Sequence, residues 1–272
     1  MKNEEHAGLP QLREINSVTE SIGDRMKPAV VVVFAVLLIF VPGLSAQTAD
    51  PTAFGNKNTL APFVEYSNDS SHIVLGRAAN RKFTALGLQY ERRLLSNHTL
   101  NLRYAAEFRP LIMESDPVAS ITETLGPPEN LILAIGPQAV TKCFDETVNF
   151  IVRDPITGPF NESVQETCNR RWTYAQGLSP LGIRINLLPH RRLQPTGSLF
   201  AGYMLSAKKI PIDTAGSFNF TFEFGVGLEY FLSQSRSMRF EYQVQHFSNA
   251  YTADSNPGVD SGLFKLSYTF GR

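Results

Sequence analysis

The segment 218-FNFTFEFGVGLEYFL-232 carries the strongest indication of the fold, because every second residue from Phe218 to Leu232 is apolar. A period of two in hydrophobicity indicates a β-strand. The run is roughly three times as long as the usual strand of about 5–6 residues. A soluble β-sandwich also alternates, but here one face is apolar throughout. The opposite face carries charged and small residues, as the narrow polar interior of a membrane barrel requires.

The same alternation recurs along the chain, for example where Phe264, Leu266 and Tyr268 face away from Lys265 and Ser267. We predict eight strands, and an even number suits closure of a sheet into a barrel without exposed edges. Their approximate ranges are 58–66, 82–94, 98–112, 173–187, 195–206, 217–232, 236–248 and 261–271.

The predicted connections fall into two length classes that alternate along the chain. Residues 95–97, 188–194 and 233–235 form short turns, whereas residues 67–81, 113–172, 207–216 and 249–260 form long loops. Short periplasmic turns and long external loops are typical of outer-membrane barrels. We therefore predict an all-β fold, an eight-stranded antiparallel transmembrane β-barrel of the outer-membrane type. It comprises residues 47–272 and has one long external loop insertion, residues 113–172, which a disulfide between Cys143 and Cys168 closes into a small subdomain.

Residues 1–46 are predicted to be an N-terminal extension and a signal peptide. The apolar run 29–41 follows Arg25 and Lys27 and precedes small residues that end at Ala46. This run is shorter than the ~20 residues that a membrane-spanning helix needs, so export with cleavage after Ala46 is favoured over a membrane anchor. Either Met1 or Met26 can serve as the start of translation.

Composition excludes several classes of function. The chain has 25 basic and 25 acidic residues, which disfavours a nucleic-acid-binding protein. Its two cysteines stand in no metal-binding pattern, so we expect neither a metal site nor a cofactor. A narrow channel is also disfavoured, because side chains largely fill an eight-stranded barrel. Charges expected on its inner faces can pair there: Arg103, Glu107, Arg184, Glu223, Glu229, Arg239 and Glu241.

Two polar residues, His246 and Ser248, end the predicted strand 236–248. Both continue a face that otherwise points apolar side chains at lipid, where polar groups are costly unless they lie at the interface or serve a purpose. Residues two apart in a strand share a face at a Cα separation of about 6.6–6.8 Å. The imidazole and the hydroxyl can then form the base and nucleophile of a catalytic triad. The loop that follows offers Asp260 or Asp254 as the acid.

Spacing alone favours a plainer interpretation. In that interpretation His246 belongs to a polar–aromatic girdle at the membrane interface and Ser248 simply ends its strand. A His-x-Ser pair occurs by chance in many sequences, so the geometry of one strand does not decide between the two interpretations.

A longer pattern resembles the signature of the lipid A 3-O-deacylase family. It consists of the block 246-HFSNA-250, the turn 256-NPG-258 and then Asp260. Weaker similarity extends to 65-EYS-67 with Ser70 and to 86-LGLQY-90. Members of this family are outer-membrane acyl hydrolases with eight-stranded barrels.

The resemblance implies a role for each matching residue. His246 corresponds to the general base, Ser248 to the nucleophile and Asp260 to the acid that orients the base. The best-known members carry Glu at this last position. Asn256 corresponds to the residue implicated in stabilising the oxyanion, and Asn249 is a second candidate for that role.

The expected function is therefore that of a serine esterase. It would hydrolyse an ester-linked acyl chain of lipid A, within lipopolysaccharide of the bacterial cell outer membrane. Lys208 and Lys209 either pair with lipid phosphates or are simply solvated loop charges. The alternative is a non-enzymatic barrel with a structural or adhesive role through residues 113–172. The ester position, the acyl length and homo-oligomerisation stay open.

Overall fold

A computed structural model describes residues 53–67, 70, 73–127, 129–156 and 158–271 of the chain. The predicted extension and signal peptide, residues 1–46, lie outside the described residues. The described part consists of ten strands. They are β1 (Asn58–Ser67), β2 (Lys82–Ser96), β3 (Leu100–Leu125), β4 (Leu131–Ala139), β5 (Glu146–Asp154), β6 (Gly158–Leu187), β7 (Leu193–Ser206), β8 (Phe218–Ser233), β9 (Arg236–Ser248) and β10 (Val259–Gly271). No helix among the described residues is long and apolar enough to cross a membrane.

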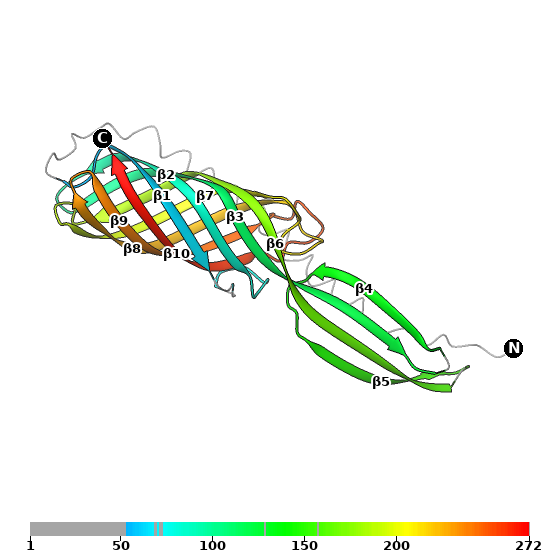
Figure 1. Cartoon of the computed structure of the whole chain (residues 1–272). Coiled ribbons are helices and arrows are strands. Elements are labelled where there is room, and N and C mark those ends of the chain that lie inside the picture. Colours follow the sequence, from blue (N-terminus) through cyan, green and yellow to red (C-terminus); the bar gives the residue numbers. More distant parts are fainter. Residues whose placement is uncertain (1–52, 68–69, 71–72, 128, 157, 272) are drawn as a thin grey trace. The chain divides into compact units, whose positions relative to one another are not determined.

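Eight of these strands close into an antiparallel barrel (Figure 1). The sheet runs in the order β4-β3-β2-β1-β10-β9-β8-β7-β6-β5, and β3 also pairs with β6. That pairing, from Leu100↔Leu187 to Leu125↔Glu162, joins the two ends of the ring β3-β2-β1-β10-β9-β8-β7-β6. The eight-stranded barrel predicted from the alternation is confirmed.

The two faces of the barrel wall differ as the alternation predicts. Outward-facing Phe222, Phe224 and Phe240 are about half exposed, and they belong to an apolar belt that a lipid bilayer would cover. The interior is filled by paired charges. Arg109 bridges three carboxylates, those of Glu65, Glu107 and Glu223. Further pairs join Lys265 to Glu65 and Glu107, Arg184 to Glu91 and Glu241, Arg239 to Glu91, Glu229 and Glu241, and Arg103 to Glu91.

Residues 113–172 differ from the loop that the sequence predicts. β3 and β6 continue to pair beyond the barrel rim, where β4 takes the place of β2 beside β3 and β5 takes the place of β7 beside β6 (Figure 1). We call this four-stranded segment, residues 116–171, the extension. Cys143 and Cys168 are joined by a disulfide within it. Its strands were missed because alternation is weak there, and pairing with distant partners supplies the order.

The antiparallel topology gathers four connections at one end of the barrel. These are the β1–β2 loop (residues 68–81), the extension, the β7–β8 loop (residues 207–217) and the β9–β10 loop (residues 249–258). The candidate site residues His246 and Ser248 end β9 at this rim, and Asp260 begins β10 there.

Candidate active site

His246 and Ser248 lie on the outer wall of the barrel, at the rim. Strand register places Asp260 of β10 directly opposite His246. On the other side, Phe222 of β8 is opposite His246 and Phe220 is opposite Ser248. Residues opposite each other in an antiparallel pair point to the same face. The site therefore combines a polar trio with an aromatic wall on β8.

The His246 imidazole is hydrogen-bonded to Asp260, since its Nδ1 lies 2.6 Å from Asp260 Oδ1. The aspartate side chain is fully buried and that of His246 is 16% exposed. The rival candidate, Asp254, is an exposed loop residue. Because Nδ1 is engaged by the carboxylate, Nε2 is the imidazole nitrogen left to accept a proton, which is the arrangement of a base oriented by an acid.

Ser248 shares the outward face with His246 two residues further along β9. Among the described residues, no hydrogen bond joins Ser248 Oγ to His246. Catalytic hydrogen bonds are often long without substrate and tighten when it binds. Residues i and i+2 of a strand share a face at about 6.6–6.8 Å between Cα atoms, so the two side chains are neighbours on the outer wall.

The second oxygen of Asp260 is held by a feature that sequence reasoning missed. Asp260 Oδ2 accepts hydrogen bonds from four consecutive backbone amides of the β1–β2 loop, those of Ile73, Val74, Leu75 and Gly76, at 3.0, 2.5, 2.9 and 2.9 Å. Successive amides that converge on one point form an anion-binding nest. They stabilise the negative charge of Asp260 and fix the direction in which Oδ1 faces His246.

Two glycines allow this close approach of loops and side chains. A Cβ atom at Gly76 would lie 2.5 Å from Asp260 N, a distance that no side chain tolerates. Gly258 has a φ of +59°, and a Cβ there would come within 3.0 Å of His246 Cε1. Gly258 O also accepts a hydrogen bond from the Ala78 amide at 3.1 Å. Gly258 of the predicted turn therefore contacts both the β1–β2 loop and the His246 imidazole.

The two asparagines that the resemblance singles out have different surroundings. Asn249 is buried, and its side chain binds Ser255 O at 2.8 Å and the Tyr251 amide at 2.9 Å. Asn256 is half-buried, and its Oδ1 accepts from the Asn249 amide at 3.1 Å. This contact fixes the orientation of the Asn256 carboxamide. No described residue accepts a hydrogen bond from Asn256 Nδ2.

Charged groups lie in the β7–β8 loop, at the same end of the barrel as the site. Lys208 and Lys209 are exposed in the β7–β8 loop. In the same loop, Asp213 binds Arg171 of the extension at 2.5 Å and the Ala139 amide at 2.8 Å. Partial burial alone would raise the pKa of Asp213, but the hydrogen bonds from Arg171 and Ala139 hold it below its usual value. The β7–β8 loop is thus tied to the extension while its two lysines face solvent.

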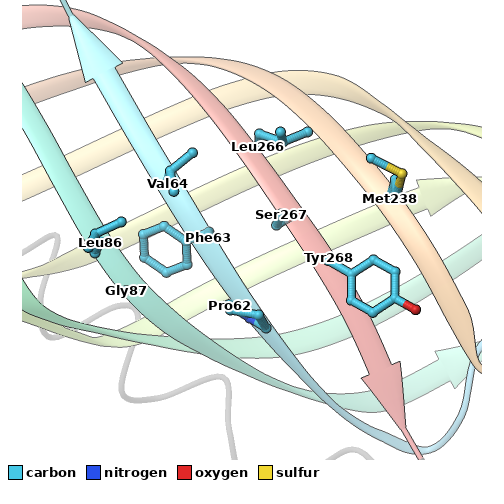
Figure 2. A pocket seen from close by; sticks show the side chains of 9 residues that line it. All are labelled: Pro62, Phe63, Val64, Leu86, Gly87, Met238, Leu266, Ser267 and Tyr268. Atoms are coloured by element: carbon cyan, nitrogen blue, oxygen red, sulfur yellow. The ribbon is translucent and has the colours of Figure 1, made fainter.

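A shallow apolar groove of about 310 Å³ lies elsewhere on the outer wall (Figure 2). It is lined mainly by Pro62, Val64, Leu86, Leu266 and Tyr268, with Met238 at one side. Met238 precedes His246 by eight residues on β9, which corresponds to about 26 Å along a strand. This groove faces the lipid belt and is not part of the candidate site.

Comparison with known proteins bears on the half of the barrel that contains the site. Residues 169–269 match the lipid A 3-O-deacylase family, PagL. The matched segment runs from β6 to β10 and includes His246, Ser248, Asn256 and Asp260. It leaves out β1, β2 and the amides that hold Asp260. The resemblance seen in the sequence is confirmed over this segment. No curated protein sequence matches the chain significantly.

Solved structures of small outer-membrane proteins are similar at low identity. Neisserial surface protein A matches with 8% identity and a TM-score of 0.40, covering 79% of this chain and 97% of that one. Ail of Yersinia pestis matches with 9% identity and a TM-score of 0.33, covering 79% and 99%. OprG of Pseudomonas aeruginosa matches with 10% identity and a TM-score of 0.36, covering 81% and 98%. Independently of these matches, a closed antiparallel ring with an apolar outer belt and a charged interior is an outer-membrane barrel, and the protein lies in the bacterial outer membrane.

Proposed function

We propose that this protein is a lipid A deacylase, a serine esterase that hydrolyses an ester-linked acyl chain of lipid A in the outer leaflet. The observation that carries the proposal is the hydrogen bond between His246 and Asp260, on the lipid-facing wall and beside Ser248. The family match over residues 169–269 names lipid A as the substrate class. A buried, hydrogen-bonded polar pair at this place has no packing role that an apolar pair would not fill better.

The proposed reaction is acyl transfer through Ser248. His246 Nε2 takes the hydroxyl proton while Ser248 Oγ attacks the ester carbonyl, and Asp260 stabilises the imidazolium that forms. The imidazolium returns the proton to the leaving sugar oxygen, so the ester C–O bond breaks and an acyl-enzyme remains. Water, deprotonated by His246, then attacks the acyl group. This second step releases a free fatty acid and restores Ser248.

Asn256 is the proposed oxyanion donor. Its Oδ1 is anchored by the Asn249 amide, which holds the carboxamide in place next to the end of β9. A donor that is oriented before reaction is worth about 10²–10³ in kcat. Asn249 instead holds the turn in shape through its contacts to Ser255 and Tyr251, so we assign it a supporting role.

The position of the site suits a substrate that is itself part of the membrane. An ester at the headgroup boundary can reach Ser248 by lateral movement, with no entry into the filled interior. Phe220 and Phe222 are both 40% exposed beside the catalytic strand and provide an apolar surface for the acyl chain. The exposed Lys208 and Lys209 can pair with lipid phosphates above it.

The test is mass spectrometry of lipid A from cells that make the wild-type protein, Ser248→Ala, His246→Ala or the control Ser233→Ala. Ser233 is an exposed serine at the opposite end of β8. We expect loss of one acyl chain from lipid A with the wild type and the control, and intact lipid A with both site variants. Heat-modifiable migration in gels reports that each barrel is folded.

Two outcomes would contradict the proposal in different ways. Full deacylation by Ser248→Ala would exclude this residue as the nucleophile. Intact lipid A in cells that make a folded wild-type barrel would count against the enzyme altogether and favour a structural or adhesive role for the extension.

A further inference from the structure

Arg81, the last residue of the β1–β2 loop, is fully buried and uses its guanidinium to bind several segments at once. Its Nε lies 3.3 Å from Asp116 Oδ1, at the base of the extension. Its remaining donors reach backbone carbonyls of the loop itself, the extension and the β7–β8 loop: Ala79 and Thr141 at 2.5 and 2.7 Å, Val140 at 2.6 Å and Pro211 at 3.0 Å. A planar fork with five donors suits such a junction, and lysine would not replace it.

Within the β1–β2 loop, hydrogen bonds connect Arg81 and its neighbours to Ser70. Ser70 Oγ accepts from the Arg81 amide at 3.0 Å and donates to Ala78 O at 3.0 Å. The Asn80 amide binds Ser70 O at 3.2 Å. These hydrogen bonds join the two ends of the loop. The segment 73–81 is therefore restrained at the end that contains Arg81.

The opposite side of the same loop contacts the catalytic acid. The Arg77 amide binds Pro257 O at 2.7 Å, and the Ala78 amide binds Gly258 O at 3.1 Å. The four preceding amides converge on Asp260 Oδ2. The loop therefore lies between Arg81 on one side and Asp260 on the other, with main-chain hydrogen bonds at both contacts.

We propose that Arg81 is a positioning residue for the deacylation reaction, acting through the β1–β2 loop on Asp260. The proposal rests on the function proposed above. Arg81 touches neither the substrate nor the reacting atoms. It fixes the loop whose amides set the direction of the Asp260 carboxylate, and the carboxylate in turn orients His246. A displacement of about 1 Å in such a chain can cost about 10²-fold in rate.

The proposal also gives the extension a part in catalysis. Asp116, Val140 and Thr141 belong to it, and each supplies an acceptor to Arg81. The Ala79 amide additionally binds Thr141 O at 3.3 Å. The base of the extension therefore supports the catalytic acid indirectly, through Arg81 and the β1–β2 loop.

The experiment is a double-mutant cycle between Arg81→Ala and Asp260→Ala, with rates of acyl release from lipopolysaccharide in detergent micelles. We expect Arg81→Ala to lower kcat by about 10- to 100-fold with KM changed less than about twofold. In the Asp260→Ala background the same change should lower kcat less than about twofold, because the group through which it acts is gone. Independent, additive losses would overturn the proposal.

The matched control is Arg171→Ala. Arg171 also faces Asp116, at 3.6 Å, but its hydrogen bonds go to Asp213 and Lys209 and none of its described contacts reaches the β1–β2 loop. We expect its kcat to stay within about twofold of the wild type. An equal loss in Arg171→Ala would mean that any damage to the rim lowers the rate, and the specific role of Arg81 would be rejected.

Two further measurements keep the proposal testable if Arg81→Ala folds poorly or lipid A is not the substrate. Ser70→Ala removes the hydrogen bonds of Ser70 Oγ within the same loop and leaves no buried charge unpaired. We expect a smaller fall in kcat that is likewise non-additive with Asp260→Ala. Proton NMR needs no substrate. The hydrogen-bonded Nδ1 proton of His246, assigned by its loss in His246→Ala, should shift or broaden in Arg81→Ala but not in Arg171→Ala. An unchanged signal in Arg81→Ala would refute the positioning role even where no deacylation is seen.

Discussion

Asp260 presents its two carboxylate oxygens to different partners. Oδ1 faces His246 Nδ1, whereas Oδ2 receives the four amides of residues 73–76. A backbone amide can be supplied by almost any residue type. Only position 76 requires glycine, because its backbone packs directly against the backbone of Asp260. This nest fits the short aspartate side chain, because both oxygens are already in contact with their partners.

The first prediction concerns the length and charge of this side chain. Asp260→Asn should lower kcat by about 10³-fold or more, because an amide does not stabilise the imidazolium in the same way. Asp260→Glu should lower it by about 10²-fold, because one more methylene drives the carboxylate out of register with the loop amides or with His246. Rates of acyl release from purified folded barrels test both values. Wild-type activity in Asp260→Glu would show that the nest does not constrain the acid.

At the scale of elements, the outer rim is held together by buried ion pairs rather than by apolar packing alone. Asp116 of β3 lies between Arg81 and Arg171, and its side chain is fully buried. Burial raises the pKa of Asp116 from 3.8 to about 6, although the two arginines act in the opposite direction. Relative to the unfolded chain, the folded rim therefore favours the neutral carboxyl, and the ion pairs of Asp116 need a pH above about 6.

The second prediction is the pH dependence that follows. A carboxyl whose pKa is raised by folding contributes stability that is fully present below its unfolded value and is lost as pH rises through the folded value. As the pH rises from 3.8 to about 6, the free energy of unfolding of the wild type should fall relative to that of Asp116→Asn, which cannot ionise. Thermal unfolding of both proteins across this range is the measurement. Parallel curves would show that Asp116 does not titrate as described.

At the scale of the whole molecule, the barrel ring and the extension are built from different sets of paired residues. β3 and β6 close the ring through the rungs from Leu100↔Leu187 to Ser115↔Trp172, and the rungs beyond belong to the extension. The interior charges of the barrel pair among themselves, as Arg109 does with Glu65 and Glu223. The extension is therefore not needed to fill or close the barrel.

The third prediction is that replacing residues 119–168 by a short turn leaves a folded barrel. Heat-modifiable migration and resistance of the core to protease should match those of the wild type. Deacylation should fall about as far as in Arg81→Ala, because the Val140 and Thr141 carbonyls are removed with the extension. A variant that no longer forms a barrel would contradict the separability of the two parts.

The strands of the barrel and the outward face of His246 and Ser248 could be predicted from the sequence. Both follow from local alternation, because a bilayer selects apolar residues at every second position whatever the partner strand. The loop after β9 offered Asp260 and Asp254 as the acid, and the resemblance pointed to Asp260. The tertiary structure shows that Asp260 is the one hydrogen-bonded to His246, and it revealed the loop amides and Arg81. Those amides lie 184 to 187 residues from Asp260 in the chain. Backbone N–H groups are common to almost every residue, so their convergence leaves no mark in the sequence. The strands within residues 113–172 escaped prediction for a related reason, since they are held by pairing between distant segments rather than by a local pattern.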